Sequence, residues 1–578
     1  MFVTASRAEQ RLTDLLADVT VIGAEEIARA GIGGLAALLQ RQSGVEIVSN
    51  GGPGSTSGVF LRGANTAQTM VLIDGQRVGS STSGTAALEA IPLEQIERIE
   101  ILRGPASSLY GADALGGVIQ VFTRRGGDGL AANAGAGYGS YDTSSAFGGV
   151  SGRSGDGSGP WRFAAQAGHR QSDGFNAIGN PKNFSYNPDR DGYRNDNVSA
   201  SAGYRFASEQ EILAQLFRSR LNAKFDGGPA FDDRTVTIVE TYSIANYNRI
   251  APYWKSNLTA AQTRDDSGSE TRFGPSRFRT RQRLYSWQND FMPGYGRISV
   301  ITERREERID SDTAFAVTSR NTNAVAGIYQ IGEGAHLAQA SLRRDDGTQF
   351  GARTTGTAAY GYAIAPGWRA TASLGTAFKT PTFNDLYFPG FSNPELKPET
   401  AHNAELALRY TDSTLSVGLV AYRNRVRNLI VFECDANFNC APQNVVNATL
   451  EGVTVELSAR VGEIGLKGSV DLQRPTDDAS GLLLPRRARR HVALALTHDA
   501  GALRLGAELI ASTARFDDAA NTRRMGSYAL LNLTAQYPLA SRWSLLARVD
   551  NALDKRYELA ADFNSPRANG FVGIRWVY

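Results

Sequence analysis

VLIDGQRVGSSTSGTAALEAIPLEQIERIEILRGPASSLYGADALGGVIQVFTRR, residues 71–125, is the stretch that decides the fold. A short apolar strand, Met70 to Ile73, stops at Asp74-Gly75, a pair that favours a tight hairpin turn because both residues tolerate positive φ. Ile91-Pro92 opens a helical turn, and alternating isoleucines from Ile96 predict a second strand. A last strand is expected at Val118 to Phe122. The stretch therefore predicts a small mixed α+β domain.

The pattern of the sequence changes after Gly126. Short segments in which apolar and polar residues alternate begin there and continue to the C-terminus. Leu503, Leu505 and Leu509, for example, alternate with Arg504 and Glu508. A charge that pointed into lipid at mid-depth would cost roughly 2–4 kcal/mol, so the charged face must line an aqueous lumen. Dividing the roughly 450 remaining residues among ~22 strands gives about 20 per strand and loop, which predicts barrel strands of ~10 residues.

The composition narrows the class of protein. The chain has 578 residues, 61 glycines, 21% charged residues and a mean hydropathy of −0.29, with no run of ~18 apolar residues, which excludes a helical membrane span. The net charge of +3 is too small to indicate a nucleic-acid partner. Because the sequence has no Ser/His/acid set, no G-x-S-x-G and no H-E-x-x-H, we do not expect an enzyme.

The two cysteines, Cys434 and Cys440, lie in the segment CDANFNC. They are close enough for a small disulfide, which an oxidising periplasm would permit, and a zinc or redox site lacks further ligands nearby. The chain opens with MFVTASRAEQ, without the basic and apolar regions of a secretory signal. We therefore expect the sequence to be a mature form, or to start after the first residue of the natural gene product.

Three blocks resemble the plug domain of TonB-dependent outer-membrane receptors: LIDG at 72–75, IERIEILRGP at 96–105 and YGADALGGVIQVFT at 110–123. The resemblance implies a transmembrane antiparallel β-barrel of about 22 strands with the α+β plug in its lumen, in the outer membrane of a Gram-negative bacterium. It divides the chain into a TonB box and linker at 1–14, a plug at 15–127 and a barrel at 128–578. The alternative is a soluble α+β domain whose glycines and arginines only build turns.

The N-terminal residues Phe2, Val3, Thr4 and Ala5 resemble the TonB box, which pairs as an added strand with TonB, the partner of ExbB and ExbD. The alternative is a frayed terminus. A plug that must move should contact the barrel through hydrated hydrogen bonds and ion pairs and not through apolar packing. The arginines expected to make these contacts are Arg62, Arg103, Arg124 and Arg125.

Within the family, the blocks at 422–424, 451–453 and 484–488 are most similar to the cobalamin receptors. This implies uptake of cobalamin (vitamin B12) by a monomer, with delivery to a periplasmic binding protein. The cargo is expected to bind at plug apices and outer-loop aromatics, namely Asn50, Ser55, Ser57, Ser81, Ser83, Tyr193, Phe231, Tyr387 and Phe391. A ferric siderophore is the alternative cargo, and a passive channel or adhesin is the alternative class.

We expect no required cofactor. Whether the outer loops bind calcium is left open by the sequence. The cobalamin receptors bind calcium in outer loops, and the matching positions here carry Asp189, Asp191, Asp226, Asp232 and Asp233. Clustered carboxylates on loops suit calcium, which tolerates irregular oxygen coordination. The alternative is that these are ordinary solvated loop acids.

Overall fold

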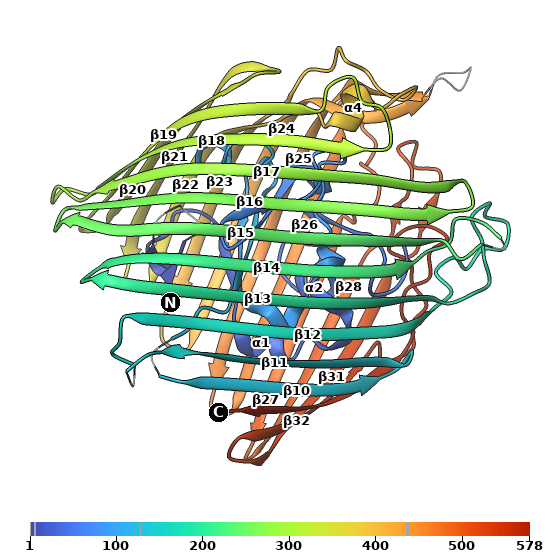
Figure 1. Cartoon of the computed structure of the whole chain (residues 1–578), viewed down its shortest axis with the longest axis horizontal. Helices are drawn as coiled ribbons and strands as arrows, with labels where there is room; N and C mark the ends of the chain where they lie inside the picture. The colour runs from blue at the N-terminus through green and yellow to red at the C-terminus, as the bar shows by residue number, and fades with distance from the viewer. Residues whose placement is uncertain are drawn as a thin grey trace.

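A closed barrel of antiparallel strands surrounds an N-terminal domain in the computed structural model of the chain (Figure 1). The structure describes residues 2–4, 7, 9–127, 129–155, 157–229, 231–434 and 440–578. Within these residues the barrel has 22 strands, each paired with its neighbours in chain order, and β10 pairs with β33 to close the ring. This is the predicted architecture, and it is confirmed. None of the described helices is long and apolar enough to span a membrane.

The barrel strands range from 8 residues in β32 to 22 in β25, so the predicted length of ~10 is wrong for most of them. A strand needs only about 9–11 residues to cross the bilayer, and the remainder extends the wall beyond it. The strands are β10 Ala131–Gly139, β11 Thr143–Arg153, β12 Trp161–Phe175, β13 Asp191–Ala207, β14 Gln210–Lys224, β15 Arg234–Ala251, β16 Trp254–Thr271, β17 Gly274–Phe291, β18 Arg297–Ser311, β19 Ser319–Glu333, β20 His336–Gly347, β21 Gly351–Ala365, β22 Trp368–Lys379, β23 Glu399–Thr411, β24 Leu415–Cys434, β25 Cys440–Val461, β26 Ile464–Asp477, β27 Arg490–Ala500, β28 Leu503–Ser512, β31 Tyr528–Ala540, β32 Trp543–Asp550 and β33 Asn569–Val577.

Long connections gather at one end of the barrel and short turns at the other. The long ones include 176–190, 380–398, 513–527 and 551–568. The second holds α4 Phe383–Tyr387, and the third holds the small hairpin of β29 Arg515–Phe516 and β30 Arg524–Met525. The N-terminal segment lies at the short-turn end, where Arg297 and Arg369 donate hydrogen bonds to the carbonyls of Glu9 and Thr13. Outer-membrane barrels have short periplasmic turns and long extracellular loops, which sets the orientation.

The plug is built on a five-stranded sheet with the order β3-β8-β9-β6-β7. The predicted hairpin turn is confirmed, because β6 pairs with β7 across Asp74 and Gly75, with φ of 51° and 83°. The plug elements are β3 Val19–Ile22, α1 Ala24–Ala28, η2 Gly31–Gly33, α2 Gly34–Leu39, β4 Val45–Ser49, β5 Ser57–Leu61, η3 Thr66–Gln68, β6 Thr69–Ile73, β7 Gln76–Val78, η4 Leu88–Ala90, η5 Leu93–Gln95, β8 Ile96–Arg103, α3 Ser107–Tyr110 and β9 Gly117–Thr123.

Apolar packing joins the plug to the barrel, which corrects the prediction of purely polar contacts. Plug residues such as Leu88 and Leu93 share one buried cluster with Phe217 of β14 and Leu530 of β31. Two further clusters also contain side chains of both plug and wall. Inward-facing apolar residues on the wall meet plug residues and not water, so burying them lowers the free energy of the closed state.

The predicted ion pairs are also present, but only two of the four arginines meet barrel carboxylates. Arg62 contacts Glu405 at 2.5 Å, and Arg103 lies 3.7 Å from Glu456. Arg125 instead contacts Asp74 of the plug itself at 3.4 Å, and no barrel carboxylate lies within ion-pair distance of Arg124 among the described residues. The plug is therefore held by a mixture of apolar clusters and buried charge pairs.

Candidate functional site

Two plug loops reach the extracellular mouth of the barrel. The first, residues 50–56, lies against β12 and β13, where a Cβ on Gly54 would fall 2.6 Å from the Tyr193 ring. Gly54 has a φ of 93°, so both its backbone conformation and its close contact favour glycine. The second, residues 79–87, contacts the start of α4, whose Phe383 and Asn384 N–H groups donate to plug carbonyls at 3.1 Å. These loops carry residues that were expected at the plug apices, Asn50 and Ser55 in the first and Ser81 and Ser83 in the second.

The residues predicted to bind cargo divide into two groups. Asn50, Ser83, Phe231 and Phe391 are exposed, and Ser55 and Tyr387 are partly exposed. The other three are used in structural contacts: the Ser57 hydroxyl donates to Glu89 at 2.9 Å, the Ser81 hydroxyl donates to Glu307 at 2.8 Å, and Tyr193 is buried. The Ser57 contact lies within the plug, whereas Ser81 and Tyr193 join the plug to the wall, and none of the three side chains is free to meet a ligand.

An aromatic chain runs across the mouth and includes three residues that were not predicted from the sequence, Phe278, Phe315 and Phe432. Phe388, after α4, lies 6.4 Å from Phe278 of β17, 6.0 Å from Phe315 and 6.4 Å from Phe391, measured between ring centroids. Phe391 in turn lies 6.5 Å from Phe432 of β24. Apart from Phe388 and Phe391, which share one connection, these rings come from separate hairpins, so no local spacing in the sequence could bring them together. The chain offers an apolar surface to a bulky ligand.

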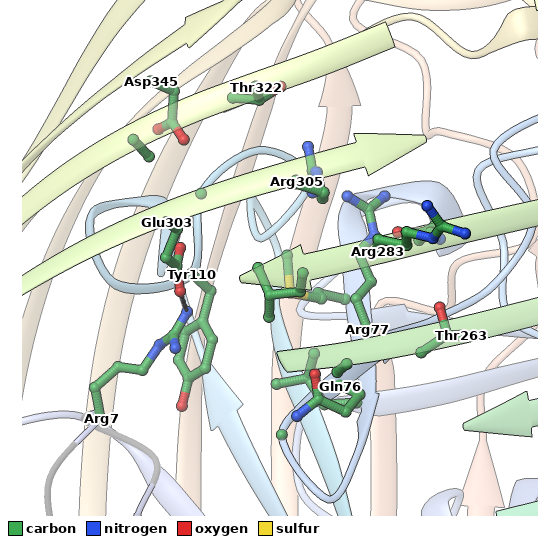
Figure 2. A pocket seen from close by; sticks show the side chains of 18 of the residues that line it. Arg7, Gln76, Arg77, Tyr110, Thr263, Arg283, Glu303, Arg305, Thr322 and Asp345 are labelled. Atoms are coloured by element: carbon green, nitrogen blue, oxygen red, sulfur yellow. Dashed lines mark hydrogen bonds and ion pairs between the residues drawn. The ribbon is translucent and has the colours of Figure 1, made fainter. Parts of the chain in front are cut away.

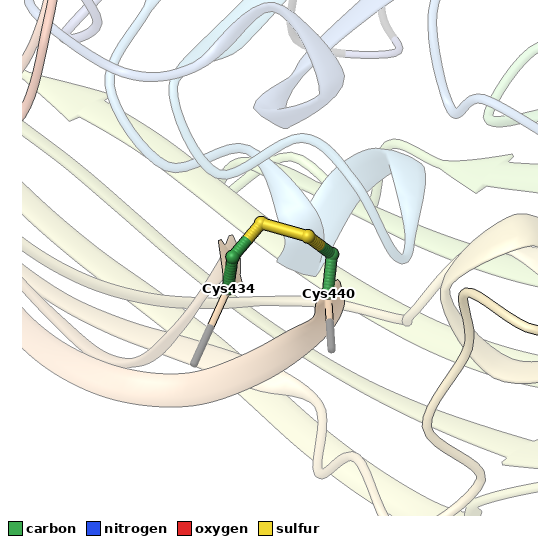
Figure 3. Close-up of a disulfide and its surroundings, with 2 residues drawn as sticks. All are labelled: Cys434 and Cys440. Atoms are coloured by element: carbon green, nitrogen blue, oxygen red, sulfur yellow. A yellow bond between two sulfur atoms is a disulfide. The ribbon is translucent and has the colours of Figure 1, made fainter. Parts of the chain in front are cut away.

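Cys434 and Cys440 form a disulfide at the tip of the hairpin made by β24 and β25 (Figure 3). They are opposite one another in the ladder register. The bond lies two residues beyond Phe432, the last ring of the aromatic chain. It therefore fixes the strand ends that carry this ring.

Three of the five predicted calcium ligands come together. Carboxylate oxygens of Asp189, Asp191 and Asp226 lie within 4.8 Å of one another. Each of these residues has a buried Oδ1 without a hydrogen-bond partner in the described part of the chain, and both carboxylate oxygens of Asp233 share this property. Asp232 instead forms an ion pair with Lys224 at 2.8 Å.

The electrostatics of this aspartate cluster fit a cation. Burial, together with the neighbouring carboxylates of Asp189 and Asp233, raises the pKa of the Asp226 carboxyl to about 6 against two backbone hydrogen bonds that lower it. Unpartnered oxygens of several carboxylates are the ligands that calcium prefers. Asp189, Asp191 and Asp226 could hold the ion, with Asp233 beside them.

The predicted TonB box is docked at the periplasmic end. β1 Phe2–Val3 pairs with β2 Gln10–Arg11, which is followed by η1 Leu12–Asp14, and the Thr4 N–H donates to Glu100 at 2.9 Å. Ala5 lies outside the described residues. Arg7 lies over the Tyr110 ring and contacts Glu303 of the barrel at 2.9 Å. The segment is therefore tied to both the plug and the wall.

A polar cavity of about 50 Å³ lies between the plug and strands β16–β20 (Figure 2). Arg7, Arg77, Tyr110, Glu303 and Arg305 line it, among others. Arg77 crosses from β7 toward Asp113, which it contacts at 2.5 Å. The cavity has room for several waters, and two arginines of its lining form ion pairs, Arg7 with Glu303 and Arg77 with Asp113.

Family models cover nearly all of the chain. The TonB-dependent receptor plug domain matches residues 11–118, and the TonB-dependent receptor-like β-barrel matches residues 122–552. The chain is a TonB-dependent receptor. It is consequently an outer-membrane protein of a Gram-negative bacterium, and its family confirms the recognition made from the plug blocks.

Full-length relatives of this receptor carry a more specific description. It is 30% identical to "Vitamin B12 transporter BtuB" of Photobacterium profundum, over 98% of this chain and 93% of that protein. It is 29% identical to the protein of the same description in Vibrio vulnificus, over 96% and 91%. The ferric enterobactin receptor PfeA of Pseudomonas aeruginosa superposes with a TM-score of 0.83 at 18% identity, over 97% of this chain and 98% of that one, which shows the shared fold.

Proposed function

We propose that this receptor takes up cobalamin across the outer membrane, driven by TonB. The observation that carries the proposal is the near-complete match to two relatives described as vitamin B12 transporters. The extracellular mouth supports it, because two plug loops and a chain of aromatic rings together offer a broad surface for a bulky ligand. Capture needs no chemistry on the cargo, and we propose no catalytic role.

Calcium would act before the cargo binds. We assign Asp189, Asp191 and Asp226 as its ligands, because their unpartnered oxygens converge between the loops after β12 and β14. A bound cation would neutralise the repulsion among these carboxylates and hold the two loops together. An ordered pair of loops loses less conformational entropy when the cargo arrives, so calcium should tighten cobalamin binding.

Release would begin at the opposite end of the plug. In our proposal TonB, with ExbB and ExbD, pairs with the backbone of Phe2–Ala5 and replaces its pairing with β2. Pulling this segment would break the contacts of Arg7 with Glu303 and Tyr110, and so transmit force to both plug and wall. A periplasmic binding protein would then receive the cargo from a monomeric receptor.

A ferric siderophore is the second candidate cargo, because aromatic and arginine-rich outer loops suit an anionic chelate as well. A passive channel or adhesin is disfavoured by the plug, which fills the lumen with buried clusters shared with the wall.

Equilibrium binding of cyanocobalamin to the purified receptor tests the proposal. We expect nanomolar affinity in calcium and at least tenfold weaker binding after chelation. Ferric enterobactin serves as the competing ligand. Tight, calcium-independent binding of the chelate without cobalamin binding would replace the proposal with the siderophore alternative.

A further inference from the structure

The outer face of the barrel carries a row of three arginines in direct register. Arg264 of β16 is opposite Arg281 of β17, and Arg281 is opposite Arg308 of β18. The flanking residues Gln282 and Glu307 are buried toward the lumen, so Arg281 and Arg308, both exposed, point outward. We call Arg264, Arg281 and Arg308 the arginine row.

Like charges opposite one another on a sheet are separated by only about 4.5–5.5 Å between Cβ atoms and destabilise the pairing. Within the described residues, no carboxylate lies within ion-pair distance of Arg281 or Arg308. Arg264 does have acidic partners, Glu240 and Asp266. The row therefore carries uncompensated positive charge that an external anion would neutralise.

Four acidic groups lie near the row, Glu240, Asp266, Glu306 and Asp310, and each is paired with at least one arginine outside the row. Asp310, which pairs with Arg279, is 76% exposed. The Glu240 and Asp266 side chains are only 7% and 3% exposed, because arginines cover them. Arg218 and Arg277, which pair with these two carboxylates, are 50% and 53% exposed. The face that this part of the wall presents outward is consequently cationic.

The position of the row along the barrel indicates what it meets. Tyr285 and Trp287 of β17 are exposed on the same outer face, on the periplasmic side of Arg281. Aromatic side chains of this kind form the girdles at the membrane surface of outer-membrane barrels. Trp287 is only four residues from the periplasmic end of β17, so it lies within the inner half of the membrane band. Arg281 and Arg264 are each the eleventh residue from the periplasmic end of their strands. Because a strand crosses the bilayer in about 9–11 residues, the arginine row lies at the outer boundary, at the depth of the outer-leaflet headgroups. Figure 1 shows β16, β17 and β18 side by side on one face of the wall.

We propose that the arginine row is a binding site for the phosphate groups of outer-leaflet lipid. A guanidinium group matches the geometry of phosphate oxygens and can donate two parallel hydrogen bonds, and one phosphate between opposite arginines would relieve their repulsion. Arg283, two ladder positions toward the periplasmic end, adds positive charge along the same path, whereas Arg304, opposite Tyr285, is paired with Glu306. The row is on the lipid-facing wall, away from the cargo mouth, so the site is independent of the proposed cargo.

The test compares the receptor in phosphatidylcholine nanodiscs with and without lipopolysaccharide, whose lipid headgroup carries phosphates. Native mass spectrometry counts the lipopolysaccharide retained, and titration gives its apparent affinity. The variant is Arg281→Gln with Arg308→Gln, because neither side chain holds a carboxylate. The matched control, Arg205→Gln with Arg542→Gln, removes two exposed arginines at the periplasmic end of the barrel that likewise form no ion pair within the described residues.

We expect the arginine-row variant to bind lipopolysaccharide roughly 30-fold more weakly, at about fivefold for each arginine near a charged membrane surface, and the control to bind as the wild type does. Heat-modifiable electrophoretic mobility checks that both variants remain closed barrels. Unchanged lipopolysaccharide affinity in the variant would overturn the proposal. So would equal saturation of the wild-type site by millimolar inorganic phosphate, because the site would then recognise the free ion and not the lipid.

Discussion

Glu89 is a plug carboxyl whose protonation should change near neutral pH. Its carboxylate accepts hydrogen bonds from the N–H and hydroxyl of Ser57, and burial raises its pKa to about 7. The folded plug therefore binds this proton more tightly than the unfolded chain does. The resulting stabilisation is complete near pH 4 and is lost as the pH rises through about 7.

Glu89→Gln should raise the melting temperature of the plug at pH 8 and leave it nearly unchanged at pH 5, because the amide imitates the protonated acid. Thermal unfolding followed by circular dichroism at both pH values measures the difference. Asp14→Asn, which changes an exposed carboxyl, should show no such pH dependence. An equal effect of Glu89→Gln at pH 5 and pH 8 would contradict the prediction.

The Asp226 carboxyl should make calcium binding weaker at acidic pH. Its pKa is about 6, and burial raises the pKa of Asp191 to about 7, so protons compete with calcium below pH 7 and the affinity should fall by at least tenfold per pH unit below 6. Isothermal titration calorimetry at pH 7.5 and 5 measures this. Asp226→Asn should weaken calcium binding at pH 7.5, whereas Asp232→Asn should not, because Asp232 is paired with Lys224. Calcium binding that is equal at both pH values would exclude the site.

At the scale of elements, the N-terminal strand should transmit force through its backbone. Val3→Pro removes an N–H and should abolish energised cobalamin uptake, while Val3→Ala keeps the N–H and should retain it. Deletion of Phe2–Ala5 should likewise stop uptake but leave surface binding intact. Uptake of labelled cobalamin by whole cells, with binding measured on the same cells, separates the two steps. Loss of binding in the deletion would show that the segment supports the fold and not transport.

Local chemistry explains which elements were predictable. The turn at Asp74-Gly75 needs only two residues that accept positive φ, and the barrel strands repeat a period of two, so both are visible in the sequence. The aromatic chain from Phe278 to Phe432 and the apolar contact of Leu88 with Phe217 depend on hairpins that are distant in sequence. Asp232 and Asp233 are adjacent in sequence, yet only Asp233 lies beside the aspartate cluster, because Lys224 holds Asp232.

At the scale of the whole molecule, the plug and the wall meet at a buried charge network around Asp18. Although burial opposes ionisation, the guanidinium groups of Arg103, Arg62 and Arg409 hold the pKa of the Asp18 carboxyl far below its usual range. Arg62 also contacts Glu405, so it joins two plug segments to β23. Removing one partner of such a network leaves uncompensated buried charge.

Arg62→Ala should therefore destabilise the plug within the barrel by about 3–5 kcal/mol. Lys467→Ala removes another ion pair between plug and wall, with Glu26, but its lysine is 44% exposed and the loss should be below about 1 kcal/mol. Urea unfolding, followed by protease sensitivity of the plug, compares the two variants. Equal losses would show that burial does not set the strength of these contacts.

The seam between β10 and β33 has a consequence for biogenesis. Every other neighbouring pair in the ring is joined by the next segment of chain, but Asn133 meets Val577 only when the last strand has arrived. Until that moment both terminal strands expose unpaired backbone groups, which would template aggregation. Losing a few C-terminal residues should therefore leave an open sheet that cellular quality control degrades, instead of a slightly weaker pore.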